Sequence, residues 1–405
     1  MNFIGVLGLA VLLTIAWIFS TNRSKIQPRI IIWGLALQFV LAILVMRTPA
    51  ALALDWFSDK VTLALEKADA GALFLFGALA NEETLLGNQD ALGFIFAFKV
   101  LPTIIYISSF FSVLYYLGIL QKLVLFMAKI MVRTMGTSGA ESLSTAANVF
   151  MGQTEAPLVV MPYIPKMTHS ELCTLMVGGM ATISGGVMAA YISMGIEANF
   201  LLAASVMNAP AAILISKMLV PETGTPLTRG KVKLEVERTE VNVIDAAARG
   251  AGAGLHLALN VGAMLIAFLS LVALVNWPLQ SVGLSLEQIL AWIFAPLAFV
   301  MGVPWADAGH VGTLFGEKLI LNEFVAYADL IKLKADGVLS ARSELIATYA
   351  LCGFANLGSI GIQLGGIGGI APTRKSDLAK LGLRVVLGGS LATFMTATIA
   401  GLLNP

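Results

Sequence analysis

The sequence predicts an all-α polytopic membrane protein, and three observations indicate it. The 405 residues are 58% hydrophobic and only 12% charged, whereas an ordinary soluble protein is about 25% charged. Apolar runs recur at the length of a membrane span, which needs about 20 residues. Residues 30–46 carry no charged side chain, and residues 254–277 carry only a histidine. Finally, two parts of the chain follow one plan, in which a polar tip is followed by a broken apolar helix.

The basic residues predict how the chain is oriented, because Lys and Arg concentrate in the cytoplasmic loops of membrane proteins. The first 20 residues lack the basic start and cleavage site of a signal peptide, so we expect them to form the first span. Basic residues follow directly at 22–29, which places the N-terminus outside. Residues 221–250 and 373–380 are expected inside by the same rule, and the C-terminus outside. The basic residues within 332–342 argue against placing their own loop outside.

Composition also excludes several classes of protein. A net charge of +1 and the lack of a basic stripe give no indication of a nucleic-acid partner. Cys173 and Cys352 both lie in apolar segments, so we expect two small buried side chains, with neither a disulfide nor a metal site. No bound cofactor is expected.

The middle and the end of the chain carry two copies of the same plan. An acidic tip comes first, at Glu155 and again at Glu323, and the tripeptide SEL follows each of them. A Gly-rich apolar helix comes next, with a polar break at Thr182 in the first copy and at Asn356 in the second. Three predicted spans separate the two tips, so the second copy enters from the opposite face. Inverted repeats with broken helices are typical of secondary transporters.

These patterns predict four parts of the chain. Residues 51–92 are too broken by polar residues for a span, and we expect a helix and loop on the outer membrane surface. The predicted parts are an N-terminal scaffold at 1–92; a first repeat at 93–220, with a hairpin near 140–166 and a broken helix near 171–195; a cytoplasmic loop at 221–250; and a second, inverted repeat at 251–405, with a hairpin near 308–335 and a broken helix near 343–370.

The stretch GQTEAP, residues 152–157, predicts a re-entrant hairpin. Only about five apolar residues flank it on each side, which is too short to span a membrane. Gly152 permits an unusual turn, and Pro157 can start a second half-helix. A carboxylate at this depth costs about 2–3 kcal/mol, and no basic residue lies near Glu155 in the sequence to pair with it. We therefore expect Glu155 to face a ligand, with a structural ion pair or an interfacial position as the alternative.

The two polar breaks predict the chemistry of the ligand. Together with the two tips they supply carboxylate, amide and hydroxyl groups but no fixed positive charge. Such groups suit a neutral, hydroxyl-rich ligand with an amide-like ring, and Phe354 offers the ring an apolar face. We expect the tips and the breaks to form one substrate pocket in the middle of the membrane.

The segments NVFMGQTEAPLVV, LNEFVAY and CGFANLGSIGI resemble those of the concentrative nucleoside transporter family, and the resemblance extends over nearly the whole chain. It implies a homotrimer in the cytoplasmic (inner) membrane. Each protomer would have eight transmembrane helices, two re-entrant hairpins and a mobile core, and would carry nucleosides inward with sodium or protons.

The resemblance also assigns roles to residues. The base would be bound by Gln153, Thr154 and Glu155, with Val187 and Phe354 packed against it, and the ribose by Glu323, Asn356 and Ser359. Sodium would be bound by Asn148, the Met151 carbonyl, Thr182 and the Ile183 carbonyl. Members of the family often have serine where Thr182 stands, and both residues offer a hydroxyl.

Four questions stay open at this point. The neutral oxygens of the ion site favour sodium over protons, but proton coupling is the alternative, and the preferred nucleoside is not fixed. A membrane-embedded hydrolase or transferase could use Glu155 and Glu323 as an acid–base pair, but it would also need a nucleophile or a metal. A channel would be distinguished by downhill flow. We therefore predict a symporter for nucleosides such as uridine, working by alternating access, and not an enzyme.

Overall fold

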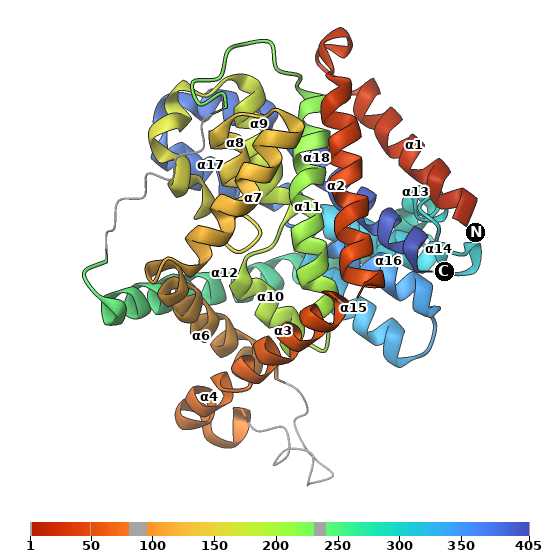
Figure 1. The fold of residues 1–405 in the computed structure, drawn as a ribbon. Coiled ribbons are helices and arrows are strands. Elements are labelled where there is room, and N and C mark those ends of the chain that lie inside the picture. Colours follow the sequence, from red (N-terminus) through yellow and green to blue (C-terminus); the bar gives the residue numbers. More distant parts are fainter. Residues whose placement is uncertain (1, 49, 81–94, 231–239, 405) are drawn as a thin grey trace.

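The computed structural model describes residues 2–48, 50–80, 95–230 and 240–404, and these residues are almost entirely helical (Figure 1). They contain no β-strand, only an isolated bridge between Ser138 and Arg229. The predicted all-α class is therefore confirmed.

The helices follow one another in three groups. The N-terminal group contains α1 (Asn2–Ile18), η1 (Arg23–Lys25), α2 (Pro28–Arg47), α3 (Ala50–Leu65), α4 (Ala68–Phe76) and η2 (Gly77–Ala80). The middle group contains α6 (Phe96–Tyr116), α7 (Ile119–Met135), α8 (Gly139–Ala147), η3 (Ala156–Lys166), α9 (His169–Ala181), α10 (Gly185–Ser193) and α11 (Ala198–Leu219). The last group contains α12 (Val243–Gln280), α13 (Leu286–Val300), α14 (Trp305–Ile320), α15 (Glu323–Ala335), α16 (Ala341–Leu351), α17 (Leu357–Ile370), η4 (Pro372–Arg374) and α18 (Lys375–Leu403).

Six helical stretches in the described residues are long and apolar enough to cross a membrane. They are α2, α6, α9 with α10, α11, α12, and η4 with α18. A seventh is reached if α13 and α14, which are bent by 119° at their junction, count as one broken span. The chain is thus a polytopic membrane protein. The apolar part of α1, at Ile4–Ile18, is shorter than these, and the predicted surface loop extends into residues 81–94, outside the described residues.

The same order of elements occurs twice. The first copy is α8, η3, α9 and α10, and the second is α14, α15, α16 and α17. In both copies SEL lies in the first turn of a helix that is capped by a hydroxyl: Thr168 accepts a hydrogen bond from the Glu171 N–H, and Ser340 accepts one from the Ser343 N–H. Such caps satisfy backbone donors that have no partner within the helix. The sequence match therefore marks equivalent helix starts.

The first hairpin differs from our prediction in its second arm. Pro157 lies at the start of that arm, as expected, but η3 is a 3₁₀ helix with a kink at Val160 rather than an α-helix. Pro162 and Pro165 lie inside it. A proline has no N–H and its ring clashes with the preceding turn, so two prolines three positions apart disfavour a regular α-helix here.

Burial separates an inner core from outer helices. The span α9–α10 is completely buried and α18 is 89% buried over its apolar stretch, whereas α12 is only 11% buried. In an apolar helix of this length, such exposure indicates a face turned to lipid or to another protein. Figure 1 shows α2 and α11 lying side by side along one face of the core, and the two helices are in contact.

The basic segments that we expect in the cytoplasm are joined to one another at one end of the molecule. The contacts are Arg29 donating to the carbonyls of Arg133 and Thr134 at 2.8 Å each, the bridge between Ser138 and Arg229, Thr168 Oγ1 donating to Glu222 Oε2 at 2.9 Å, and Arg374 donating to the Met167 carbonyl at 2.7 Å. The two chain ends lie together elsewhere, with Gly5 of α1 against Leu402 of α18 (Figure 1).

Candidate functional site

A chain of hydrogen bonds connects the first tip, the second break and the second tip. Gln153 Nε2 donates to Ser359 Oγ at 3.2 Å, and the Ser359 N–H donates to Asn356 Oδ1 at 2.8 Å. Asn356 Nδ2 then donates to Glu323 Oε2 at 3.0 Å, and the Tyr191 hydroxyl donates to Glu323 Oε1, also at 3.0 Å. The structure thus brings four of the predicted substrate residues together and adds Tyr191, which the sequence analysis did not identify.

Helix ends position the two central members of this chain. Asn322 caps α15 by accepting from the Val325 N–H at 3.0 Å, so that Glu323 is the first residue of the helix. Asn356 caps α17 in the same way. The N-terminal end of a helix carries a partial positive charge and unpaired N–H groups, which favour a carboxylate there. This explains how Glu323 is accommodated although only 3% of it is exposed.

Thr154 packs against α17 through a glycine. A Cβ added to Gly366 would lie 2.8 Å from Thr154 Cγ2, which is closer than real contacts allow. The lack of a side chain at Gly366 therefore lets the first tip approach the second broken helix.

Glu155 points elsewhere. It is exposed, and its Oε2 accepts a hydrogen bond from the Gly152 N–H at 2.9 Å. It lines a cavity of about 650 Å³ between η3, α6, α10 and α12, and Ser184 and Arg249 also lie on the cavity wall. Glu323 is not among the lining residues of this cavity. The two acidic tips are thus connected through Gln153 rather than through direct contact in a single hollow.

Two of the predicted sodium ligands, Asn148 and Thr182, each lie next to Gly178. Asn148 ends α8; its Nδ2 donates to the Ser144 carbonyl at 3.0 Å, while its buried Oδ1 has no hydrogen-bond partner among the described residues. Thr182 Oγ1 donates to the Gly178 carbonyl at 2.8 Å, and a Cβ on Gly178 would lie 3.5 Å from Asn148 Nδ2. A buried acceptor without a partner is costly, and a small cation would satisfy it.

The other two ligands predicted for sodium lie on the adjoining backbone. Met151 is in the turn after α8, and Ile183 is in the break between α9 and α10. The Gly185 N–H donates to the Phe150 carbonyl at 3.0 Å and holds the turn against the break. Carbonyl oxygens next to such a break are the groups that bind sodium in other transporters with broken helices.

The two breaks themselves are in contact. The Phe354 N–H donates to the Thr182 carbonyl at 3.3 Å, and a Cβ on Gly353 would lie 2.9 Å from the Ala181 carbonyl oxygen. Phe354 is half-buried, and Val187 is buried in the first turn of α10. Val187 lies one helical turn before Tyr191, the residue of α10 that donates to Glu323.

Three polar residues near the site were missed by the sequence analysis. Tyr191 lies 4.4 Å from Tyr327 between ring centroids. Lys318, which is 1% exposed, donates to the Ala350 carbonyl at 2.6 Å and to Thr393 Oγ1 at 2.9 Å. Gln363 is completely buried beside Gln153. Tyr191 and Gln363 each interrupt an apolar run, which is the signal that could have identified them, whereas Lys318 follows Glu317 and does not stand out in this way.

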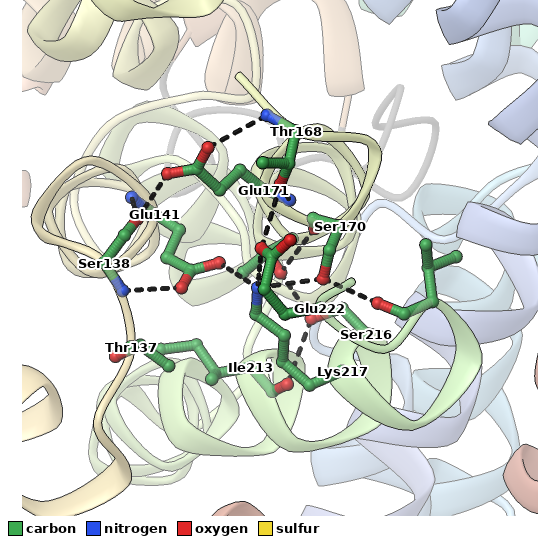
Figure 2. A network of polar contacts seen from close by, with 12 residues as sticks. Thr137, Ser138, Glu141, Thr168, Ser170, Glu171, Ile213, Ser216, Lys217 and Glu222 are labelled. Carbon is green, nitrogen blue, oxygen red and sulfur yellow. Dashed lines mark hydrogen bonds and ion pairs between the residues drawn. The ribbon is translucent and has the colours of Figure 1, made fainter. Parts of the chain in front are cut away.

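A buried charged cluster anchors the first hairpin to α11 (Figure 2). Lys217 Nζ lies 2.6 Å from Glu141 Oε2 and 3.3 Å from Glu222 Oε2, and it donates to Ser170 Oγ at 2.9 Å. Ser138, which caps α8, donates to Glu171 Oε1 at 2.6 Å. The cluster therefore connects the starts of α8 and α9 to the end of α11.

Polar groups at the ends of broken helices, buried inside a bundle of apolar helices, define a secondary membrane transporter. Comparison with known proteins identifies which kind. Residues 7–79 and 200–401 match the N- and C-terminal domains described as Na+ dependent nucleoside transporter, and residues 97–198 match a domain described as nucleoside recognition. The chain belongs to the concentrative nucleoside transporter family. The family consists of transporters and not of enzymes, so the hydrolase alternative is excluded.

Individual relatives agree with this assignment. An uncharacterized transporter of Haemophilus influenzae is 47% identical, over 98% of this chain and 96% of its own length. The nucleoside permease NupC of Helicobacter pylori is 42% identical, over 99% of this chain and 97% of its own length. Mouse solute carrier family 28 member 3 is 43% identical, and this chain spans 59% of its length. The structure of CNTnw in an inward-facing substrate-bound state is 44% identical, with a TM-score of 0.95 over 100% of this chain and 99% of the other.

Proposed function

We propose that the protein is a sodium-coupled symporter that imports nucleosides such as uridine by alternating access. The observation that carries this proposal is the unpaired, buried Oδ1 of Asn148. Asn148 lies next to Gly178, whose carbonyl accepts from the Thr182 hydroxyl. A site made of neutral oxygens suits a hard cation such as sodium, and Asn148 cannot take up a proton in its place. The solved CNTnw structure, described as substrate-bound, supports a substrate site in this fold.

The hydrogen-bonded chain supports the assignment of the substrate groups. Glu323, Asn356 and Ser359 offer acceptors and donors for the two hydroxyls of a ribose. Gln153, Thr154 and Glu155 lie on the first tip for the base, and Val187 and Phe354 supply apolar surface. Sodium would be held by Asn148, Thr182 and the carbonyls of Met151 and Ile183.

The arrangement in the membrane is also part of the proposal. The connected basic segments support a cytoplasmic position for the end of the molecule at which they lie. Both termini would then lie on the outer face of the inner membrane. Residues 1–92 would then form the scaffold, 93–220 and 251–405 two inverted repeats, and 221–250 a cytoplasmic loop. The exposed faces of α12 leave room for contacts within a homotrimer.

The test is uptake of labelled uridine into proteoliposomes with and without a sodium gradient. We expect sodium to be required, and Asn148→Leu to raise the sodium concentration for half-maximal uptake. Asn260→Leu is the control, because Asn260 is exposed in α12 and belongs to neither a tip nor a break. Equal uptake in sodium-free buffer under a pH gradient would instead establish proton coupling. An identical sodium requirement in Asn148→Leu and wild type would remove Asn148 from the ion site.

A further inference from the structure

Gln363 connects three elements at the centre of the molecule. It lies in α17, and none of it is exposed. Its Nε2 donates to the Met176 carbonyl of α9 at 2.9 Å and to Gln153 Oε1 of the first tip at 3.1 Å. Gly179 makes the approach possible, because a Cβ there would lie 2.9 Å from Gln153 Cβ and 3.0 Å from Gln363 Nε2.

The Met176 carbonyl fixes which way the Gln363 amide faces. The oxygen and nitrogen of an amide are assigned from their partners, and a carbonyl only accepts hydrogen bonds. If the amide were reversed, Gln363 Oε1 would face two acceptor oxygens. The Nε2 hydrogens of Gln363 are therefore directed one to Met176 and the other to Gln153.

The orientation of Gln363 then fixes that of Gln153. Because Gln153 Oε1 accepts from Gln363, its Nε2 must point away, where it donates one hydrogen to Ser359 Oγ. An amide nitrogen carries two hydrogens, and Ser359 Oγ is the single partner of this nitrogen in the described part of the chain. The second N–H remains for a ligand.

We propose that Gln363 is a specificity-determining residue, which turns Gln153 so that it presents a donor to the base of the substrate. This inference rests on the proposed function, in which Gln153 binds the base. A base with a carbonyl oxygen at the contacted edge can accept that donor, whereas a base with an amino group there cannot. The site therefore favours uridine, with its 4-carbonyl group, over cytidine, with its 4-amino group.

The test compares uridine and cytidine as competitors of labelled-uridine uptake in proteoliposomes. In wild type we expect cytidine to need a roughly tenfold higher concentration, about the effect of one lost hydrogen bond. Gln363→Met has a similar shape but no donor, so Gln153 can turn freely. The ratio of the cytidine concentration to the uridine concentration that inhibits uptake equally should then fall to about two or less. The sodium concentration for half-maximal uptake stays unchanged, which separates this effect from a general structural defect.

Gln38 provides a matched control. It is also completely buried, donates through Nε2 to the Gly34 carbonyl and has an Oε1 without a partner, but it lies in α2. Gln38→Met should leave the ratio at its wild-type value. If Gln363→Met does not accumulate in the membrane, Gln363→Leu serves in its place, because its smaller apolar side chain also cannot donate to Met176 or Gln153.

A double variant distinguishes failure of this inference from failure of the proposed base site. Gln363→Met should not change the ratio further once Gln153→Ala is present, since it acts through Gln153. The role of Gln363 is overturned by a wild-type ratio near one. It is also overturned if Gln363→Met leaves the ratio unchanged while Gln153→Ala alters it. If Gln153→Ala itself leaves the ratio unchanged, Gln153 does not bind the base and the proposed base site is wrong.

Discussion

Removing the carboxylate of Glu323 should abolish the recognition of the ribose hydroxyls. Each carboxylate oxygen has two lone pairs. Glu323 uses one on Oε1 for Tyr191 and one on Oε2 for Asn356, both at 3.0 Å. The lone pairs that these two bonds leave on the carboxylate can accept the 2′ and 3′ hydroxyls of a ribose. A hydrogen bond to a charged group contributes about 1.5–3 kcal/mol, so loss of one hydroxyl should weaken binding roughly 10- to 150-fold.

The assay is competition of uridine and 3′-deoxyuridine against labelled uridine in proteoliposomes. Wild type should bind 3′-deoxyuridine roughly 10- to 150-fold more weakly than uridine. Glu323→Gln should bind uridine weakly and hardly distinguish uridine from 3′-deoxyuridine. Glu317→Gln is the control, because Glu317 is 4% exposed on the preceding helix and takes no part in the hydrogen-bonded chain. If wild type bound both nucleosides equally while Glu323→Gln lost affinity for uridine, Glu323 would be structural and the ribose assignment wrong.

Three other predictions concern stability, close packing and charge movement. Lys217→Met should lower the unfolding temperature in detergent, because leaving buried Glu141 unpaired costs about 3–5 kcal/mol; an unchanged temperature would show that the cluster does not stabilise the fold. Gly366→Ala should reduce uridine uptake by displacing Thr154, whereas Gly369→Ala, with open space around it, should not; equal uptake by both would contradict the packing argument. An inside-negative potential should accelerate uptake, since each inward charge gains about 2.3 kcal/mol per 100 mV, and voltage-independent uptake would argue against one sodium per nucleoside.

The tips and the breaks could be predicted because polar residues are costly in an apolar environment. Gln153 and Glu323 stand out from the hydrophobic residues around them, and the cost of burying them implies a partner or a ligand. Pro162 and Pro165 were a further signal in the sequence, because two prolines three positions apart disfavour a regular α-helix in the second arm of the first hairpin. Our prediction considered only Pro157.

The pairing of the polar residues could not be predicted. Gln363 is 210 positions from Gln153 in the sequence, and Tyr191 is 132 positions from Glu323. Such contacts depend on how the two repeats pack, about which local patterns carry no information. The direction of Glu155 was equally hidden, because side chains in an irregular turn follow no fixed period, whereas those on helices and strands do.

The hydrogen bond between the two breaks implies that the ion and the nucleoside affect each other's affinity. Thr182 contributes its hydroxyl to the proposed sodium site, and its carbonyl accepts from the N–H of Phe354, the residue proposed to cover the base. An ion that orders the backbone at Thr182 therefore also orders the backbone at Phe354. Linkage is reciprocal, so the factor by which sodium tightens nucleoside binding must equal the factor by which nucleoside tightens sodium binding. The backbone of the two breaks is therefore most ordered when sodium and nucleoside are both bound. A transporter that crossed the membrane with only one of them would let that ligand run down its own gradient without moving the other, and this half-loaded state is the less stable one.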